Sequence, residues 1–294
     1  MLFDENSRFI ETKLKTIEKN DYQSAFRVAN NCKRIESFPL MKWQSNFSKY
    51  LRLHRFFEMS EALVIIPTYN EKENIEKMVR KVFSLPSNFH LLIVDDGSPD
   101  GTAAIVKSLQ KDFKGKLHIT ERQGKLGLGT AYIHGFKWGL ERAYEYFFEM
   151  DCDFSHDPDD LIRLYDATKN KDADVAIGSR YVKEGKVENW PTGRVLMSYY
   201  ASVYVRLVLW MNIKDTTAGF KCYKRAVLES IELDKVRFIG YAFQIEMKYR
   251  AWKKNFKLVE VPIVFTDRVA GTSKMSSGIF KEAFWGVLQM RFVI

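Results

Sequence analysis

Two carboxylates lie one residue apart directly after an apolar stretch in the middle of the chain. Residues 146–150 are mostly aromatic and apolar, and they are followed by Asp151, Cys152 and Asp153. Like charges this close disfavour each other's ionised form unless a cation lies between them. Residues two apart in an extended segment point to the same side, so both carboxylates can face one divalent cation.

Oxygen ligands of this kind suit Mg²⁺ and Mn²⁺. Mg²⁺ in particular combines one or two carboxylates with the phosphates of a substrate. The pattern therefore predicts a metal that is bound by Asp151 and Asp153 and carries a diphosphate. The alternative is an acidic turn in which Asp157 caps the next helix, because many turns contain two aspartates at this spacing.

A second acidic motif, VDDGSPDGT, occupies residues 94–102 and also follows an apolar stretch. Its glycines and its proline favour a fixed turn. A carboxylate held on such a turn can accept hydrogen bonds from a nucleobase N–H or a ribose hydroxyl, so Asp95 and Asp96 indicate a nucleotide site. The alternative is a purely structural turn in which Asp100 caps a helix.

Apolar and helical stretches alternate along residues 62–178. Strands buried on both faces are expected at 62–66, 89–94, 116–120, 145–150 and 174–178. The first helix is expected to begin near Glu71, because Asn70 and Glu73 have the spacing of a capping box. The alternation predicts an α/β fold with a Rossmann-like, mostly parallel sheet and helices on both faces. The polar motifs would then gather at the carboxyl ends of the strands, where such sheets bind ligands.

The composition limits the function classes. The chain has 294 residues, 46% of them hydrophobic, and no apolar run reaches the roughly 18 residues that a membrane span needs. Its three cysteines, Cys32, Cys152 and Cys222, are scattered without metal-ligand spacing, which is typical of a reducing compartment. The formal charge of +9 indicates an anionic partner: a nucleic acid, a phosphorylated substrate or a membrane surface. A solvated lysine-rich surface is the alternative.

Two regions of the chain differ in character. Residues 1–58 are polar and basic with weak helical patterns, so we expect an N-terminal extension that is poorly ordered or helical. A misassigned translation start is the alternative. The opening residues contain no apolar signal-peptide core. Residues 59–294 are expected to form the α/β domain, ending in an amphipathic helix whose apolar face includes Phe284, Val287 and Leu288.

Six motifs occur in one order: VIIPTYNE, VDDGSPDGT, KLGLGTAYIHG, MDCDFSHDP, GSRY and DRVAGTSKM. Together they resemble the dolichol- or polyprenol-phosphate mannose synthases, which are inverting family 2 glycosyltransferases of the GT-A fold. The resemblance covers about residues 62–290. It implies transfer of mannose from GDP-mannose to a polyprenyl (dolichyl) phosphate with Mg²⁺ or Mn²⁺. It further implies no nucleic-acid partner and a peripheral location on the cytoplasmic face of a membrane, directly or through a membrane-anchoring partner.

The resemblance also assigns roles residue by residue. Nucleotide and diphosphate contacts are implied for Pro67, Tyr69, Glu71, Val94, Asp96, Asp151, Cys152, Asp153, Arg268 and Lys274. The metal would be held by Asp151 and Asp153, with Ser155 as a third ligand where some relatives have glutamine. The acceptor phosphate would be bound by Arg180, Arg194 and Ser198. The catalytic residues would be Asp151, Asp153 and Arg180.

A phosphate acceptor simplifies the chemistry that the site has to perform. A phosphate monoester has a second pKa of about 6 and is already an anionic nucleophile at neutral pH, so no carboxylate base is needed. Arginines suit this acceptor because they donate forked hydrogen bonds to phosphate. A lipid acceptor would also explain helix 196–211 and the C-terminal helix as segments that lie on a bilayer. Packing of both helices into the core is the alternative.

Two other functions stay open on the sequence. One is transfer of glucose or N-acetylglucosamine from a UDP-sugar to the same lipid, which a comparison of GDP and UDP binding would separate. The other is non-catalytic binding of a sugar nucleotide or a lipid phosphate, which a single-turnover assay would separate.

Overall fold

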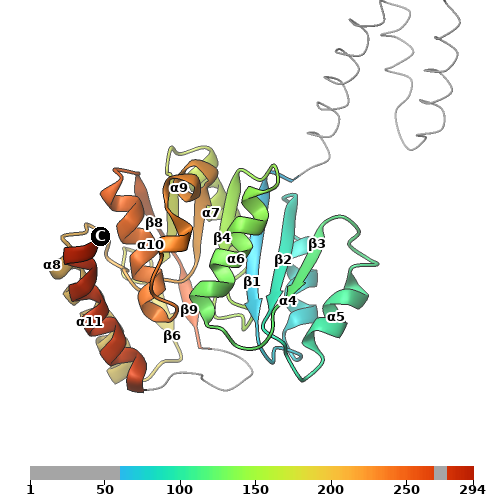
Figure 1. Cartoon of the computed structure of the whole chain (residues 1–294), viewed down its shortest axis with the longest axis horizontal. Coiled ribbons are helices and arrows are strands. Elements are labelled where there is room, and N and C mark those ends of the chain that lie inside the picture. Colours follow the sequence, from blue (N-terminus) through green and yellow to red (C-terminus); the bar gives the residue numbers. More distant parts are fainter. Residues whose placement is uncertain (1–59, 268–276) are drawn as a thin grey trace, which may run out of the picture. The chain divides into compact units, whose positions relative to one another are not determined.

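The computed structural model describes residues 60–267 and 277–294, with only the backbone for residues 277–283 (Figure 1). The predicted N-terminal extension, residues 1–58, lies outside the described residues, as do the nucleotide-contact candidates Arg268 and Lys274. At the centre of the described chain is a seven-stranded sheet in the order β3-β2-β1-β4-β7-β5-β8. A separate parallel pair joins β6 (Lys186–Glu188) and β9 (Val264–Thr266).

The central sheet is mostly parallel, as the sequence predicts. Its strands are β1 (Ala62–Thr68), β2 (Phe89–Asp95), β3 (Leu117–Glu121), β4 (Tyr146–Glu149), β5 (Val175–Ser179), β7 (Lys221–Lys224) and β8 (Leu258–Pro262). Strand β7 runs antiparallel to both of its neighbours, β4 and β5. The sequence of residues 218–225 predicts a strand at this place. Its antiparallel insertion was not predicted, because its orientation depends on the long connection that precedes it rather than on its own residues.

Helices cover both faces of the sheet (Figure 1). One face carries α4 (Ile75–Phe83), α5 (Thr102–Leu109) and α7 (Asp160–Lys169). The other face carries α6 (Leu128–Leu140), α9 (Arg225–Ser230) and α10 (Tyr241–Lys253). The remaining elements are a short 3₁₀ turn, Leu233–Lys235, and two long helices, α8 (Thr192–Leu209) and α11 (Ser277–Val293). Helices α8 and α11 pack against each other beyond α10, at the end of the molecule away from β3 (Figure 1).

The residues of β1 show why this strand is a continuous apolar run. Leu63 and Ile65 enter the core on the α6 face, whereas Val64 and Ile66 enter the core on the α4 face. Fully burying each such side chain contributes about 1.5–3 kcal/mol. Helix α6 can lie close to this strand because Gly135 has no side chain. A Cβ at this position would lie only 2.6 Å from the Ile65 side chain. Gly135 and Gly139 of α6 thus serve helix–sheet packing.

The predicted start of the first helix is wrong. Helix α4 begins at Ile75 rather than near Glu71, and Asn70 has a left-handed backbone with φ of 57°. Tertiary contacts override the local capping pattern: the Asn70 N–H donates to Ser98 Oγ at 3.0 Å, and the Glu71 N–H donates to Thr102 Oγ1 at 3.0 Å. These bonds join the chain after β1 to the turn after β2. Glu71 still lies at the edge of the sheet that the carboxyl ends of the strands form.

His90 in β2 makes the stability of the fold pH-dependent. Burial lowers the pKa of its imidazole to about 4, and its Nδ1 lies 2.8 Å from the Tyr144 hydroxyl. The unfolded chain binds a proton at His90 below about pH 6.5, whereas the folded chain does not until about pH 4, so stability falls as pH drops through this window. We expect this group to lower the free energy of unfolding by up to about 3 kcal/mol at pH 4. Urea unfolding between pH 7.5 and 4.5 should show a shallower decline for His90→Gln, and equal slopes would contradict the assignment.

Candidate active site

A cavity of about 910 Å³ opens at the carboxyl ends of β1, β2, β4 and β5. It brings together most of the residues that the sequence singled out: Pro67, Tyr69, Glu71, Asp96, Asp151, Cys152, Asp153, Ser155, Arg180, Arg194 and Ser198. Val94 is different, because its side chain is fully buried in the core and does not line the cavity. The size of the cavity is typical of small-molecule sites.

The two adjacent aspartates after β2 have different environments. The buried carboxylate of Asp95 accepts hydrogen bonds from the Thr68 hydroxyl at 2.8 Å and from the Ser98 hydroxyl at 2.6 Å. Asp95 therefore fixes the turn. Asp96 lines the cavity instead, and its backbone N–H donates to the Thr68 carbonyl at 3.0 Å. Of the two, Asp96 is the carboxylate that a ligand in the cavity can reach.

Asp96 is held by an arginine that the sequence reasoning missed. Arg122 Nε donates to Asp96 Oδ1 at 2.7 Å, and Arg122 Nη1 donates to Thr130 Oγ1 at 2.8 Å. Both charged side chains are less than a tenth exposed, so the pair is shielded from water. The signal was present, because Arg122 directly follows β3 and so lies at the same edge of the sheet as the other motifs.

The paired carboxylates lie in bends after β4 rather than in an extended strand. Phe154 has a φ of 61°, which turns the chain back toward the cavity. Asp151 Oδ1 accepts a hydrogen bond from the Tyr132 hydroxyl at 3.3 Å, and Asp153 Oδ1 accepts one from the Ser155 N–H at 3.1 Å. The intervening Cys152 is buried in the core on the α4 face, although it also lines the cavity.

The donor set at this point fits a hard divalent cation that shares its ligands with a substrate. Within residues 60–267 and 277–294, no three His, Cys, Asp or Glu side chains cluster closely enough to enclose a metal by themselves. Two carboxylates beside a cavity large enough for a nucleotide are the arrangement that Mg²⁺ uses with substrate phosphates. Ser155 also lines the cavity, where its hydroxyl could complete the set.

His156 lines the same cavity and was not singled out from the sequence. Burial lowers the pKa of its imidazole to about 4, so the ring is neutral at physiological pH. The Asp151 N–H donates to Nδ1 at 3.3 Å, which places the ring proton on Nε2. The ring stacks on Phe220 at a centroid distance of 4.9 Å. His156 therefore shapes the wall of the cavity and adds no charge to it.

Two arginines also line the cavity, and each is paired with a carboxylate. Arg180 makes a buried bidentate pair with Asp215, with both N···O distances at 2.7 Å. Arg194 contacts Asp267 at 3.3 Å and stacks over the Trp190 ring at 3.8 Å. The first pair is tight and dry, whereas the second is longer and partly exposed. Ser198 also lines the cavity.

The cavity has an apolar end that runs between the long helices. Its lining there comes from Met197, Ala201, Tyr204 and Val205 of α8, Ile245 of α10, and Phe284 and Val287 of α11. The Tyr204 and Phe284 rings stack at 4.8 Å, which joins α8 to α11. The cavity is thus charged at the sheet and apolar between the helices, and this combination suits an amphiphilic ligand.

The fold and the carboxylate-bearing edge of the sheet define a glycosyltransferase of the GT-A class. The sequence model described as Glycosyl transferase family 2 matches residues 63–232, and the chain belongs to this family. The protein is therefore a glycosyltransferase, as the motif order predicts.

Three curated relatives indicate its place within the family. It is 49% identical over 231 residues to a polyprenol monophosphomannose synthase of Mycolicibacterium smegmatis, covering 77% of this chain and 87% of that protein. It is 43% identical to an undecaprenyl-phosphate mannosyltransferase of Micrococcus luteus, covering 77% of this chain and 94% of that protein. It is 39% identical to a dolichol-phosphate mannosyltransferase of Pyrococcus furiosus, covering 72% of this chain and 58% of that protein.

Solved structures support the fold. Glucosyl-3-phosphoglycerate synthase from Mycobacterium tuberculosis matches with a TM-score of 0.59 at 14% identity, over 79% of this chain and 80% of that one. A mannosyltransferase from Pyrobaculum calidifontis, solved with GDP-Man and Mn²⁺, matches with a TM-score of 0.51 at 13% identity, over 85% of this chain and 79% of that one. At such low identity these likenesses establish the architecture and not the substrate.

Proposed function

We propose that this protein transfers mannose from GDP-mannose to a polyprenyl phosphate, with inversion at the anomeric carbon and with Mg²⁺ or Mn²⁺. The observation that carries the proposal is the cavity, which joins two carboxylates, two arginines and an apolar end between α8, α10 and α11. The names of the three relatives support the sugar and the acceptor class. The nucleotide would lie against Pro67, Tyr69, Glu71 and Asp96.

The proposed chemistry needs charge and position rather than a general base. The acceptor phosphate is already anionic at neutral pH, so no proton has to be removed before it attacks. Arg180 and Arg194 would hold it through charge-assisted hydrogen bonds. Asp151 and Asp153 would hold the metal, which when bound offsets the charge that develops on the departing GDP. Attack from the side opposite the nucleotide inverts the sugar.

A donor panel tests this proposal. Purified protein is incubated with a short polyprenyl phosphate, Mg²⁺ or Mn²⁺, and either GDP-mannose, UDP-glucose or UDP-N-acetylglucosamine. We expect a mannosylated lipid only from GDP-mannose. Transfer from a UDP-sugar instead would show that the donor assignment is wrong. Binding of donor and acceptor without a single turnover would identify a non-catalytic binding protein.

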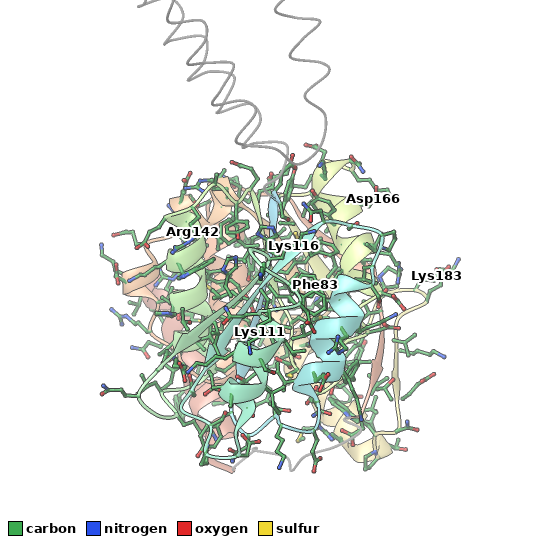
Figure 2. The ribbon with its side chains drawn as sticks, turned by 90° about the vertical axis from the view of Figure 1, so that its right-hand side faces the viewer. Phe83, Lys111, Lys116, Arg142, Asp166 and Lys183 are labelled. Carbon is green, nitrogen blue, oxygen red and sulfur yellow. The ribbon has the colours of Figure 1, made fainter. Side chains whose placement is uncertain are left out.

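An exposed apolar surface on α8 and α11 points to a membrane as the place where the lipid is met. Its large exposed side chains on the helices are Leu196, Met197, Tyr199, Tyr200, Leu207, Phe284, Trp285, Phe292 and Val293, and Trp210 is exposed directly after α8. The opposite end of the molecule, at the β3 edge, presents polar side chains such as Lys111, Lys116 and Arg142 to solvent (Figure 2). Among the described residues, no helix has the length and apolar content to span a bilayer. We propose that the α8–α11 surface docks peripherally on the cytoplasmic face.

The double variant Leu207→Ser/Trp285→Ser should reduce binding to lipid vesicles by at least about tenfold. Both side chains are more than 60% exposed, so neither replacement opens a hole in the core. Burying one large apolar side chain is worth about 1.5–3 kcal/mol, or about tenfold or more in partitioning. Lys111→Ser at the polar edge is the matched control, measured in the same vesicle co-flotation assay. No vesicle binding by the parent protein would favour a membrane-anchoring partner instead.

A further inference from the structure

The loop of residues 214–219 lies between α8 and β7 and carries a buried carboxylate that the proposed reaction does not use. Asp215 has no solvent exposure. Its Oδ2 accepts hydrogen bonds from Arg180 Nε at 2.7 Å and from the Arg180 backbone N–H at 3.0 Å. Its Oδ1 accepts one from Arg180 Nη2 at 2.7 Å. Burial alone would raise the pKa of Asp215, but the Arg180 guanidinium holds it below its usual range.

The loop itself is fixed at both ends by buried or part-buried groups. Glu260 of β8 accepts hydrogen bonds from the Lys214 and Asp215 N–H groups, both at 2.8 Å. At the other end, Lys248 Nζ donates to the Ala218 carbonyl at 2.7 Å, and Lys248 has no solvent exposure. Neither Asp215 nor the backbone that carries it has room to shift without breaking these bonds.

The result is a guanidinium with a single orientation. Thr217 Oγ1 accepts a further hydrogen bond from Arg180 Nη2 at 2.8 Å. Within the described part of the chain, these bonds occupy Nε and Nη2, and none involves Nη1. The Trp190 and Phe265 rings lie 5.8 and 5.4 Å from the Arg180 Cζ and exclude water from that side. Donors that are fixed before the substrate arrives stabilise developing charge without reorganisation.

Arg180 and Arg194 therefore have unlike physical characters. The charge of Arg180 is offset by Asp215 inside the protein, so Arg180 orients a bound phosphate more than it attracts one from solvent. Arg194 is partly exposed. Its N···O distance to Asp267 is 3.3 Å, whereas the Arg180–Asp215 distance is 2.7 Å. A looser, partly exposed cation in the cavity lining is suited to capturing an anion.

We propose that Asp215 is a positioning residue that fixes the Arg180 guanidinium against the acceptor phosphate, and that it acts on turnover rather than on acceptor affinity. The inference rests on the proposed function, because it needs a phosphate acceptor in the cavity. Fixed alignment of two reacting groups accelerates a reaction mainly through its rate constant. The loop 214–219 would be the support that holds this alignment.

A mutant cycle tests the proposal with full-length Asp215→Asn, Arg180→Gln and the double variant. We expect kcat to fall at least about tenfold in Asp215→Asn, while KM for a short polyprenyl phosphate changes less than about threefold. The double variant should be no slower than Arg180→Gln alone, because Asp215 acts through Arg180. GDP affinity, measured by calorimetry, should stay within about twofold of the parent value. This result would show that nucleotide binding is intact.

A further variant guards against a folding defect, since removing one member of a buried ion pair leaves the other uncompensated. Thr217→Val removes the hydrogen bond from Arg180 Nη2 and the long one from the Thr217 hydroxyl to Asp215 Oδ1 at 3.4 Å but keeps the buried ion pair, so it should lower kcat with an unchanged KM. Kcat losses that multiply in the double variant would overturn the inference, as would a raised KM at unchanged kcat. The inference is also wrong if the parent protein is active and Asp215→Asn has the same kcat as the parent. A parent inactive on every polyprenyl phosphate would instead overturn the proposed function, and this inference with it.

Discussion

Asp153→Asn is expected to keep the fold and lose at least about 100-fold in sugar transfer. The replacement is nearly isosteric, and its side chain can still accept the hydrogen bond that the Ser155 N–H donates to Oδ1 at 3.1 Å. What it removes is one negative charge from the pair of carboxylates that would hold the metal. Lewis-acid stabilisation by a metal is worth several kcal/mol, which corresponds to two or more decades of rate.

The metal itself provides the direct measurement for this prediction. Binding of Mn²⁺ in the presence of GDP, followed by electron paramagnetic resonance, should weaken in Asp153→Asn. Asp157→Asn is the matched control, because Asp157 is exposed and lies outside the cavity lining, where it accepts a hydrogen bond from the Asp159 N–H. Normal transfer by Asp153→Asn at limiting Mn²⁺ would show that Asp153 is not a metal ligand.

Much of this site could be located from the sequence because parallel strands end at one edge. An apolar run followed by a polar motif marks such an end, and Asp96, Asp151 and Arg180 were placed together on that ground alone. The structure puts all three in the lining of one cavity. The mostly parallel sheet and its two layers of helices followed from the same alternation, since a strand buried on both faces is apolar throughout.

The partners of these residues could not be found in the same way. Asp215 lies in a connection without a distinctive local pattern, and it meets Arg180 because that connection leads into β7, which inserts antiparallel beside β5. Glu260 meets Ser179 because β8 pairs with β5. The predicted start of α4 was wrong for a related reason. The Asn70 N–H donates a hydrogen bond to Ser98 Oγ, which joins the chain after β1 to the turn after β2. Contacts between distant segments decided each of these points.

Arg194→Ala and Asp96→Asn should have opposite effects on the two substrates. Arg194 lies at the α8 side of the cavity, and we expect its removal to raise KM for the polyprenyl phosphate. The loss of a charge-assisted hydrogen bond, worth roughly 1.5–3 kcal/mol, corresponds to about 10- to 150-fold. GDP affinity should change less than about twofold, because the proposed nucleotide wall is formed by residues after β1 and β2.

Asp96→Asn should weaken GDP about tenfold or more and leave KM for the acceptor nearly unchanged. Asparagine keeps the shape of the side chain beside Arg122, so the buried arginine retains a hydrogen-bond partner, although it loses the compensating charge. Thermal unfolding of the variant separates a weakened nucleotide site from a destabilised domain. For Arg194→Ala the matched control is Arg163→Ala, which removes a positive charge and a salt bridge to Asp160 on the surface of α7.

The pattern across both variants decides where the acceptor binds. Calorimetry gives GDP affinity, and initial rates with varied polyprenyl phosphate give KM, so each variant yields both numbers. Suppose that Arg194→Ala weakens GDP tenfold and leaves the acceptor dependence untouched. The acceptor phosphate would then lie away from α8, and the apolar end of the cavity between α8, α10 and α11 would have to hold something other than the lipid. In the predicted pattern, the acceptor phosphate lies between the charged end and the apolar end of the cavity. This position favours a lipid phosphate over a hydroxyl acceptor.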